Sequence, residues 1–129
     1  TPIKSSAASD VYKRQEYASP CNLLGDIACD NGEYGLAIDW YLKAIHRGYD
    51  ACWKKLGNIY QTGKDIHRVL ETTYQEYEKA AKQDDRVGQY YTGLCCMYGV
   101  GTPCDTTASS YWLRLAASQG WEPASRVLA

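Results

Sequence analysis

The sequence has no phenylalanine, one methionine, two histidines and four prolines among its 129 residues. It also has no uninterrupted apolar run of the length that a membrane-spanning helix needs, so no membrane span is expected. Charge of neither sign is in excess, because 14 basic and 15 acidic side chains leave a formal net charge of −1. The balance argues against a nucleic-acid-binding protein and against an acidic solvating tail.

Aromatic bulk comes instead from twelve tyrosines and four tryptophans, and 45% of all residues are hydrophobic. That proportion is ordinary for a globular protein. A chain of this length suits one domain and buries roughly two-thirds of the surface that its unfolded form exposes. The composition therefore predicts a folded core that needs neither disulfides nor a metal.

An internal repeat is visible in the spacing of glycine and alanine. Gly57 and Gly93 are 36 residues apart, as are Ala80 and Ala116, whereas Gly25 precedes Gly57 by 32 residues. Each glycine lies in a first stretch that is followed by a second one. The first stretches are residues 22–32, 54–63 and 91–101, and the second are residues 36–48, 72–84 and 108–120.

Both kinds of stretch have helical periodicity. Trp53, Leu56 and Tyr60 fall at i, i+3 and i+7, which is one face of a helix, and the second stretches repeat this spacing. A lone helical hairpin cannot bury its apolar face, but stacked hairpins can. We therefore predict an all-α fold: an α-α superhelical solenoid of about three stacked helical hairpins, near residues 17–47, 50–83 and 86–119, plus part of a fourth. The alternative is a small helical bundle.

Glycine inside a helix costs about 1 kcal/mol relative to alanine. Its recurrence at one position predicts close helix crossings at Gly57 and Gly93, with no room for a side chain. We expect the small pairs Ala80–Ala81 and Ala116–Ala117 to be the matching surfaces. Asp105 is the expected N-cap of the last full helix.

Trp53-x-x-Leu56-Gly57-x-x-Tyr60 resembles the first helix of a tetratricopeptide repeat. The segment "MYGVGTPCDTTASSYWLRLAASQG" resembles a Sel1-like repeat, with its Gly-x-Gly turn and closing Ala-Ala-x-x-Gly. The resemblance covers residues 16–129, in units of about 17–49, 50–85, 86–121 and a partial 122–129. It implies a non-catalytic scaffold for protein–protein interactions.

The resemblance further implies that the first helices line a concave face that binds a protein or peptide partner. Counted from the recurrent glycine, the expected lining residues are Asn22, Asp26, Lys54, Asn58, Tyr90, Leu94 and Met97. Tyr90, Leu94 and Met97 are the expected apolar anchors. Lys54 and Asn58 also occupy positions at which tetratricopeptide clamps hold a carboxylate, but Tyr91 stands where that clamp has Asn.

No catalytic, cofactor-binding or metal-binding residues come with this resemblance, and none is expected. Two alternatives remain open: a thiol-dependent enzyme that uses Cys95 or Cys96, and an array that regulates a catalytic domain outside this sequence. The six cysteines are expected to be free thiols, with Cys96 and Cys104 as the pair that a loop could bring together. A cysteine-rich branch of the family carries disulfides in every repeat, a pattern that these cysteines do not follow.

Residues 5–15, "SSAASDVYKRQ", belong to no repeat. They resemble, codon by codon, the translation of a transposase adapter used to prepare sequencing libraries. We expect a cloning or sequencing artefact on a fragment from a metagenomic assembly, and the alternative is a natural solvated arm. The absence of a signal peptide therefore carries no information about the cell compartment.

Removal of residues 1–15 is expected to leave the free energy of unfolding unchanged, because these residues lie outside every repeat. Thermal unfolding of the full chain should be compared with that of a chain that starts at Glu16. A loss of several kcal/mol on truncation would show that the segment packs against the fold.

Overall fold

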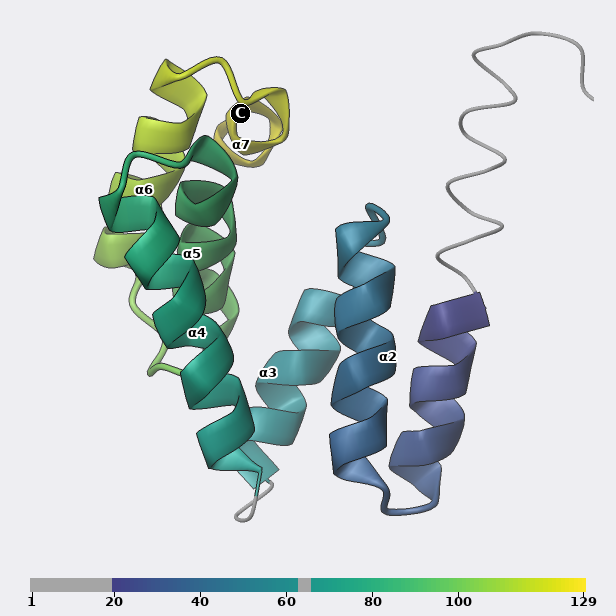
Figure 1. Cartoon of the computed structure of the whole chain (residues 1–129). Coiled ribbons are helices and arrows are strands. Elements are labelled where there is room, and N and C mark those ends of the chain that lie inside the picture. The colour runs from purple at the N-terminus through teal and green to yellow at the C-terminus, as the bar shows by residue number, and fades with distance from the viewer. Residues whose placement is uncertain (1–19, 63–65) are drawn as a thin grey trace, which may run out of the picture. The chain divides into compact units, whose positions relative to one another are not determined.

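The computed structural model describes residues 20–62 and 66–129. Every regular element in these ranges is a helix, as predicted. The N-terminal helix covers residues 20–30 of the described part, and six helices follow it in chain order (Figure 1). They are α2 (Tyr34–His46), α3 (Cys52–Thr62), α4 (His67–Lys82), α5 (Arg86–Tyr98), α6 (Thr106–Ser118) and α7 (Glu122–Leu128).

The N-terminal helix and α2 form one of the predicted antiparallel pairs, and α5 and α6 form another (Figure 1). The helices α3, α4 and α7 follow in the expected chain order. The expected turn at residues 63–65 and the leader at residues 1–15 lie outside the described residues. The chain divides into two compact units, one ending at Leu56 and the other running from Gly57 to Ala129. Each unit is described by itself below.

In the first unit, the N-terminal helix and α2 lie antiparallel, joined by a tight turn at Asn31–Gly32 (Figure 1). The core beneath them contains Ile38, Tyr41 and Trp53, each with at most 2% of its surface exposed. Gly25 is the contact point between the two helices, because a Cβ there would lie 2.5 Å from Cε1 of Tyr41. The small residue lets the aromatic ring lie against the helix backbone.

In the second unit, α5 packs between α4 and α6 (Figure 1). The two ends of α5 are capped in different ways. Asp85 begins the helix by accepting hydrogen bonds from the backbone amides of Val87 and Gly88, and Gly99 ends it in a left-handed conformation with φ of 69°. The predicted N-cap Asp105 is confirmed, because its side chain accepts hydrogen bonds from the first turn of α6.

Close approach at the recurrent glycines is also confirmed. A Cβ at Gly93 would lie 2.8 Å from Cγ of Leu113, and one at Gly57 would collide with the carbonyl oxygen of Tyr98. The expected partners were wrong, however. Ala80 and Ala81 pack against Gly88 instead, because α5 lies across α4 with that glycine at the contact.

Replacing Gly57 with Leu should lower the free energy of unfolding by about 1–3 kcal/mol, because the new side chain meets a backbone carbonyl that cannot rotate away. The control is Gly35→Leu in α2, where a Cβ has no heavy atom within 4 Å. That change should stabilise the helix by up to about 1 kcal/mol. Chemical denaturation of both variants checks the prediction, and equal stability of the two would refute the close-approach explanation.

Candidate functional site

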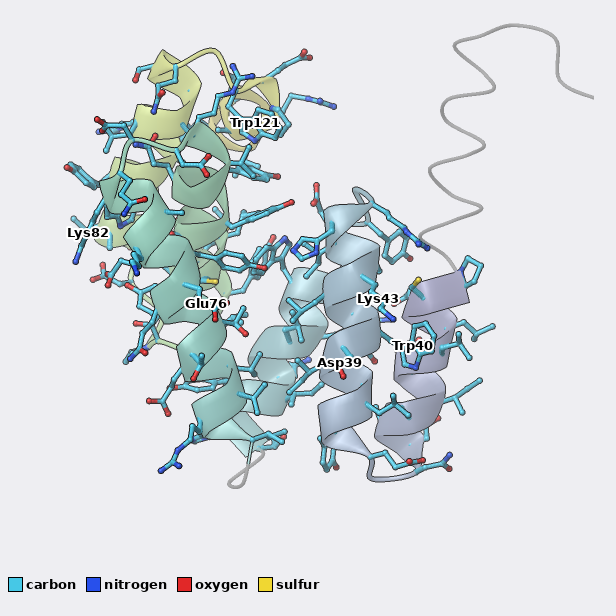
Figure 2. All side chains as sticks on the ribbon, in the orientation of Figure 1. Asp39, Trp40, Lys43, Glu76, Lys82 and Trp121 are labelled. Carbon is cyan, nitrogen blue, oxygen red and sulfur yellow. The ribbon has the colours of Figure 1, made fainter. Side chains whose placement is uncertain are left out.

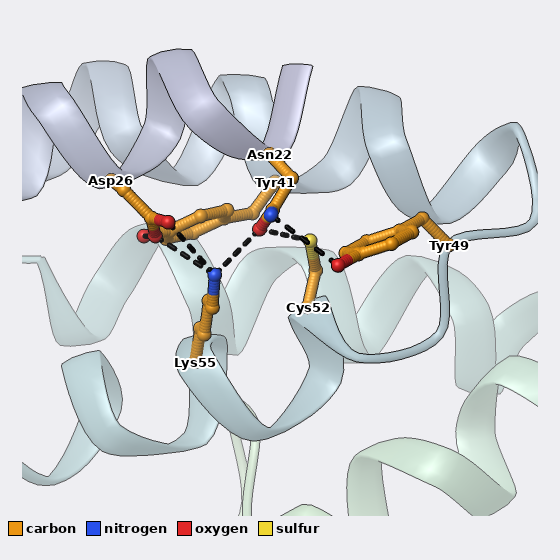
Figure 3. Close-up of polar contacts among 6 residues, drawn as sticks. All are labelled: Asn22, Asp26, Tyr41, Tyr49, Cys52 and Lys55. Carbon is orange, nitrogen blue, oxygen red and sulfur yellow. Dashed lines mark hydrogen bonds and ion pairs between the residues drawn. The ribbon is translucent and has the colours of Figure 1, made fainter. Parts of the chain in front are cut away.

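Two of the three expected lining residues of the first unit, Asn22 and Asp26, lie one turn apart on the N-terminal helix and are half-buried. Lys55 of α3 reaches both of them (Figure 3). Its Nζ donates to Asn22 Oδ1 at 2.6 Å and to the two carboxylate oxygens of Asp26 at 2.9 and 3.0 Å. The polar groups expected to meet a partner are therefore already paired within the unit.

Three further side chains complete this cluster, which we call the Lys55 network: Asn22, Asp26, Tyr41, Tyr49, Cys52 and Lys55 (Figure 3). The Tyr41 hydroxyl donates to Asp26 Oδ1 at 2.5 Å, and the Cys52 thiol donates to Asn22 Oδ1 at 3.3 Å. Asn22 in turn donates from Nδ2 to the Tyr49 hydroxyl at 3.5 Å. The network ties the N-terminal helix to α2 and to the first turns of α3.

The electrostatics of the network follow from these contacts. Burial alone would raise the pKa of Asp26, but hydrogen bonds from Tyr41 and Lys55 and the Lys55 charge outweigh it and hold this pKa below its ordinary value. Burial and the neighbouring carboxylate raise the pKa of Tyr41. Burial likewise raises the pKa of Cys52 to about 11. At neutral pH Asp26 is therefore a carboxylate, and the Tyr41 phenol and the Cys52 thiol are neutral.

Sequence reasoning chose Lys54 and missed Lys55. Lys54 lies exposed on α3, whereas Lys55 points into the first unit. Counting from Gly57 selects the exposed side of α3, and Lys55 lies on the neighbouring side that faces the N-terminal helix. The spacing of Cys52 and Lys55, three residues apart on one helix face, was the signal that could have identified it.

In the second unit, two of the three expected anchors need correction. Tyr90 and Leu94 are only 4% and 3% exposed, so neither offers surface to a partner. The Tyr90 ring packs edge-on against Trp121, with centroids 6.2 Å apart. Trp121 lies at the start of α7 (Figure 2). Met97 is half-buried. Lys54 and Asn58 are the members of the expected set that lie exposed, one turn apart on α3.

The six cysteines are all present as thiols. Cys96 and Cys104 both line a hollow of about 400 Å³ between α4, α5 and the loop before α6. Burial raises the pKa of Cys96 and, more strongly, that of Cys95. Cys104 is exposed, and its thiol donates to the carbonyl oxygen of Met97 at 3.2 Å. A low thiol pKa is what thiol catalysis needs, and the two cysteines proposed for it shift in the opposite direction.

Metal-binding chemistry has no support in the described ranges, where no group of three or more His, Cys, Asp or Glu side chains could hold an ion. A second hollow of about 640 Å³ lies along α6, between Thr106 and Ser118. Hydroxyl groups and Arg114 line it, without an acid–base pair. None of the helices in the described part of the chain is long and apolar enough to cross a bilayer.

Replacing Lys55 with Met should lower the free energy of unfolding by about 1 kcal/mol at pH 7, a modest value because both partners are about one-third exposed or more. The matched control Lys54→Met should change it by less than about 0.5 kcal/mol. Because the folded pKa of Asp26 is depressed, its contribution is present above the unfolded pKa of about 4 and is lost as the pH falls through the folded value. Denaturation between pH 7 and pH 2 checks this, and a Lys55→Met effect that does not shrink in acid would contradict it.

Comparison with known proteins shows which family this chain belongs to. The family model described as Sel1 repeat matches residues 21–49, 54–85 and 87–121, which is well over half of the chain. No curated protein matches the chain. A solved structure, a Sel1 repeat protein from Oxalobacter formigenes, is similar at 25% sequence identity with a TM-score of 0.46. The similarity covers 90% of this chain and 35% of that one, so this chain spans about a third of that protein's length. The chain belongs to the Sel1 repeat family.

Proposed function

We propose that this chain is a non-catalytic scaffold that binds a segment of another protein through the first helices of its repeats. The observation that carries the proposal is the presence of three Sel1 repeats. Sel1 repeats are generally protein-interaction scaffolds and are typically non-enzymatic. In this proposal the repeats provide a binding surface and catalyse no reaction.

The pattern of cysteine protonation supports the non-catalytic proposal over a thiol-dependent enzyme. Burial raises the pKa of Cys29, Cys52, Cys95 and Cys96, so all four favour the neutral thiol at physiological pH. A nucleophilic cysteine needs the opposite shift, with a cation or a base beside it. Regulation of a catalytic domain outside this sequence remains compatible with a binding role for these repeats.

The surface proposed for the partner is the exposed side of α3. Lys54 and Asn58 stand one helical turn apart there, and both side chains are exposed. A Lys ammonium and an Asn amide can together donate to a carboxylate or to the backbone carbonyls of an extended segment. We therefore propose that the exposed side of α3 binds the polar part of the partner.

A charge reversal at Lys54 should weaken a bound peptide at least about tenfold, which corresponds to about 1.4 kcal/mol, and should change the salt dependence of binding. The ligands are peptides selected from a library against the full chain, and affinity is measured by fluorescence anisotropy. The matched control is Lys79→Glu on α4, an exposed lysine on the second helix of its hairpin. Circular dichroism confirms that both variants keep their helices.

Equal effects of the two reversals, or none, would refute the proposal that α3 is the binding surface. Tyr90→Ala does not test it. Because Tyr90 is buried, the Tyr90→Ala change removes core packing and is expected to lower the free energy of unfolding. A loss of binding in this variant would therefore not identify the binding surface.

A further inference from the structure

Tyr98, the last residue of α5, is an exposed aromatic side chain on a helix that is mostly buried. Tyr98 is 37% exposed, whereas Leu94 and Cys95, one turn earlier, are at most 3% exposed. Among residues 20–62 and 66–129, Tyr98 takes part in no hydrogen bond, ion pair or ring contact. The fold therefore does not use this ring as core, although it uses the residues around it so.

The repeat pattern makes the position of Tyr98 an exposed one. Its equivalents are Asp30 in the first repeat and Thr62 in the second, by the spacings of 36 and 32 residues. Both are exposed, although another repeat follows each of them in this chain. A neighbouring repeat therefore leaves this position uncovered, and of the three repeats only the third places an aromatic ring there.

Tyr98 lies against α3, the helix proposed to bind the partner. A Cβ at Gly57 would collide with the carbonyl oxygen of Tyr98 and would lie 3.7 Å from its Cβ. On the helix surface, Gly57 lies between Trp53, which is 0% exposed, and Gln61, which is exposed. The exposed Tyr98 ring therefore meets α3 at the border of the side that carries Asn58 and Gln61.

Asn58 and Gln61 carry uncharged amides that remain free for a partner. Both side chains are exposed, and neither forms a hydrogen bond within the part of the chain that the structure describes. The Thr62 hydroxyl, in contrast, already donates to the backbone carbonyl oxygen of Asn58 at 3.0 Å. Of the equivalents of Asn58, Asp26 is paired within the first unit and Leu94 is buried. The free amides thus belong to the second repeat, next to Tyr98.

We propose that Tyr98 is a specificity-determining residue of the α3 surface and binds an apolar side chain from an extended, uncharged stretch of the partner. The inference rests on the proposed function, because it takes α3 as the binding surface. An amide offers the same donor and acceptor as a peptide group, so Asn58 and Gln61 match the backbone of such a stretch. Its side chains alternate between two faces, and one of them lies on the Tyr98 ring. A charged side chain is disfavoured there, because burying a charge without a partner is costly.

Peptides selected from a random library against the full chain test this inference by fluorescence anisotropy. Tyr98→Ala should weaken them at least about tenfold, because buried aromatic anchors carry much of the binding energy of an interface. Tyr98→Phe should keep the affinity within about twofold, because it retains the ring and removes only the hydroxyl. The matched control is Tyr34→Ala on α2, where Tyr34 is 39% exposed. Circular dichroism and chemical denaturation confirm that each variant is folded under the binding conditions.

The outcomes separate this inference from the proposed function. Full affinity of Tyr98→Ala, or a loss in Tyr98→Phe as large as that in Tyr98→Ala, overturns the role of the ring. If Lys54→Glu weakens the same peptides, the proposed function stands without it. If no peptide of the library binds the unaltered chain, both fail.

A second selection distinguishes a direct contact from a structural effect of Tyr98. Peptides selected against the unaltered chain should share an apolar residue at one fixed position. Peptides selected against the Tyr98→Ala chain should lose the preference at that position, whereas a variant that is only less stable would keep it. The same apolar preference from both chains overturns the proposal.

Discussion

Neighbouring helices in this protein approach the helix backbone so closely at three glycines that a side chain would not fit there, and the rest of the structure depends on that constraint. Gly25 admits the Tyr41 ring, Gly57 meets the carbonyl oxygen of Tyr98, and Gly93 lies against Leu113. Each glycine gives up about 1 kcal/mol of helix propensity. The close approach that it permits lets larger neighbours fill the space between helices, and the neighbour differs from repeat to repeat.

Polar groups at the same helix faces are used differently in the two units. In the first, the Lys55 network satisfies the polar groups of Asn22 and Asp26 within the unit, so the carboxylate, the ammonium group and the amide stabilise the fold. In the second, the equivalent positions hold Tyr90 and Leu94, which are buried. A set of equivalent positions in a repeat is therefore not a continuous binding surface, because each member meets different neighbours.

The hairpins, the close crossings and the Asp105 cap were all predictable, because helical periodicity, glycine recurrence and capping depend on residues close together in the chain. The candidate site was less predictable. Helical spacing cannot distinguish an exposed Lys54 from a Lys55 that donates to Asn22 and Asp26, about thirty residues earlier. The apolar character of Tyr90 and Leu94 suits an anchor for a partner and a core residue equally well.

The sequence by itself determined the all-α class, the three-repeat organisation and the family, because each of these depends on the spacing of residues along the chain. Only the tertiary structure decided which neighbour each small residue meets, as with Gly88 against Ala80 and Ala81. It alone also decided which polar side chains pair internally and which apolar ones stay exposed. The physical reason is that burial and hydrogen bonding depend on distances between helices, and those distances are set by the packing of side chains from all of them at once.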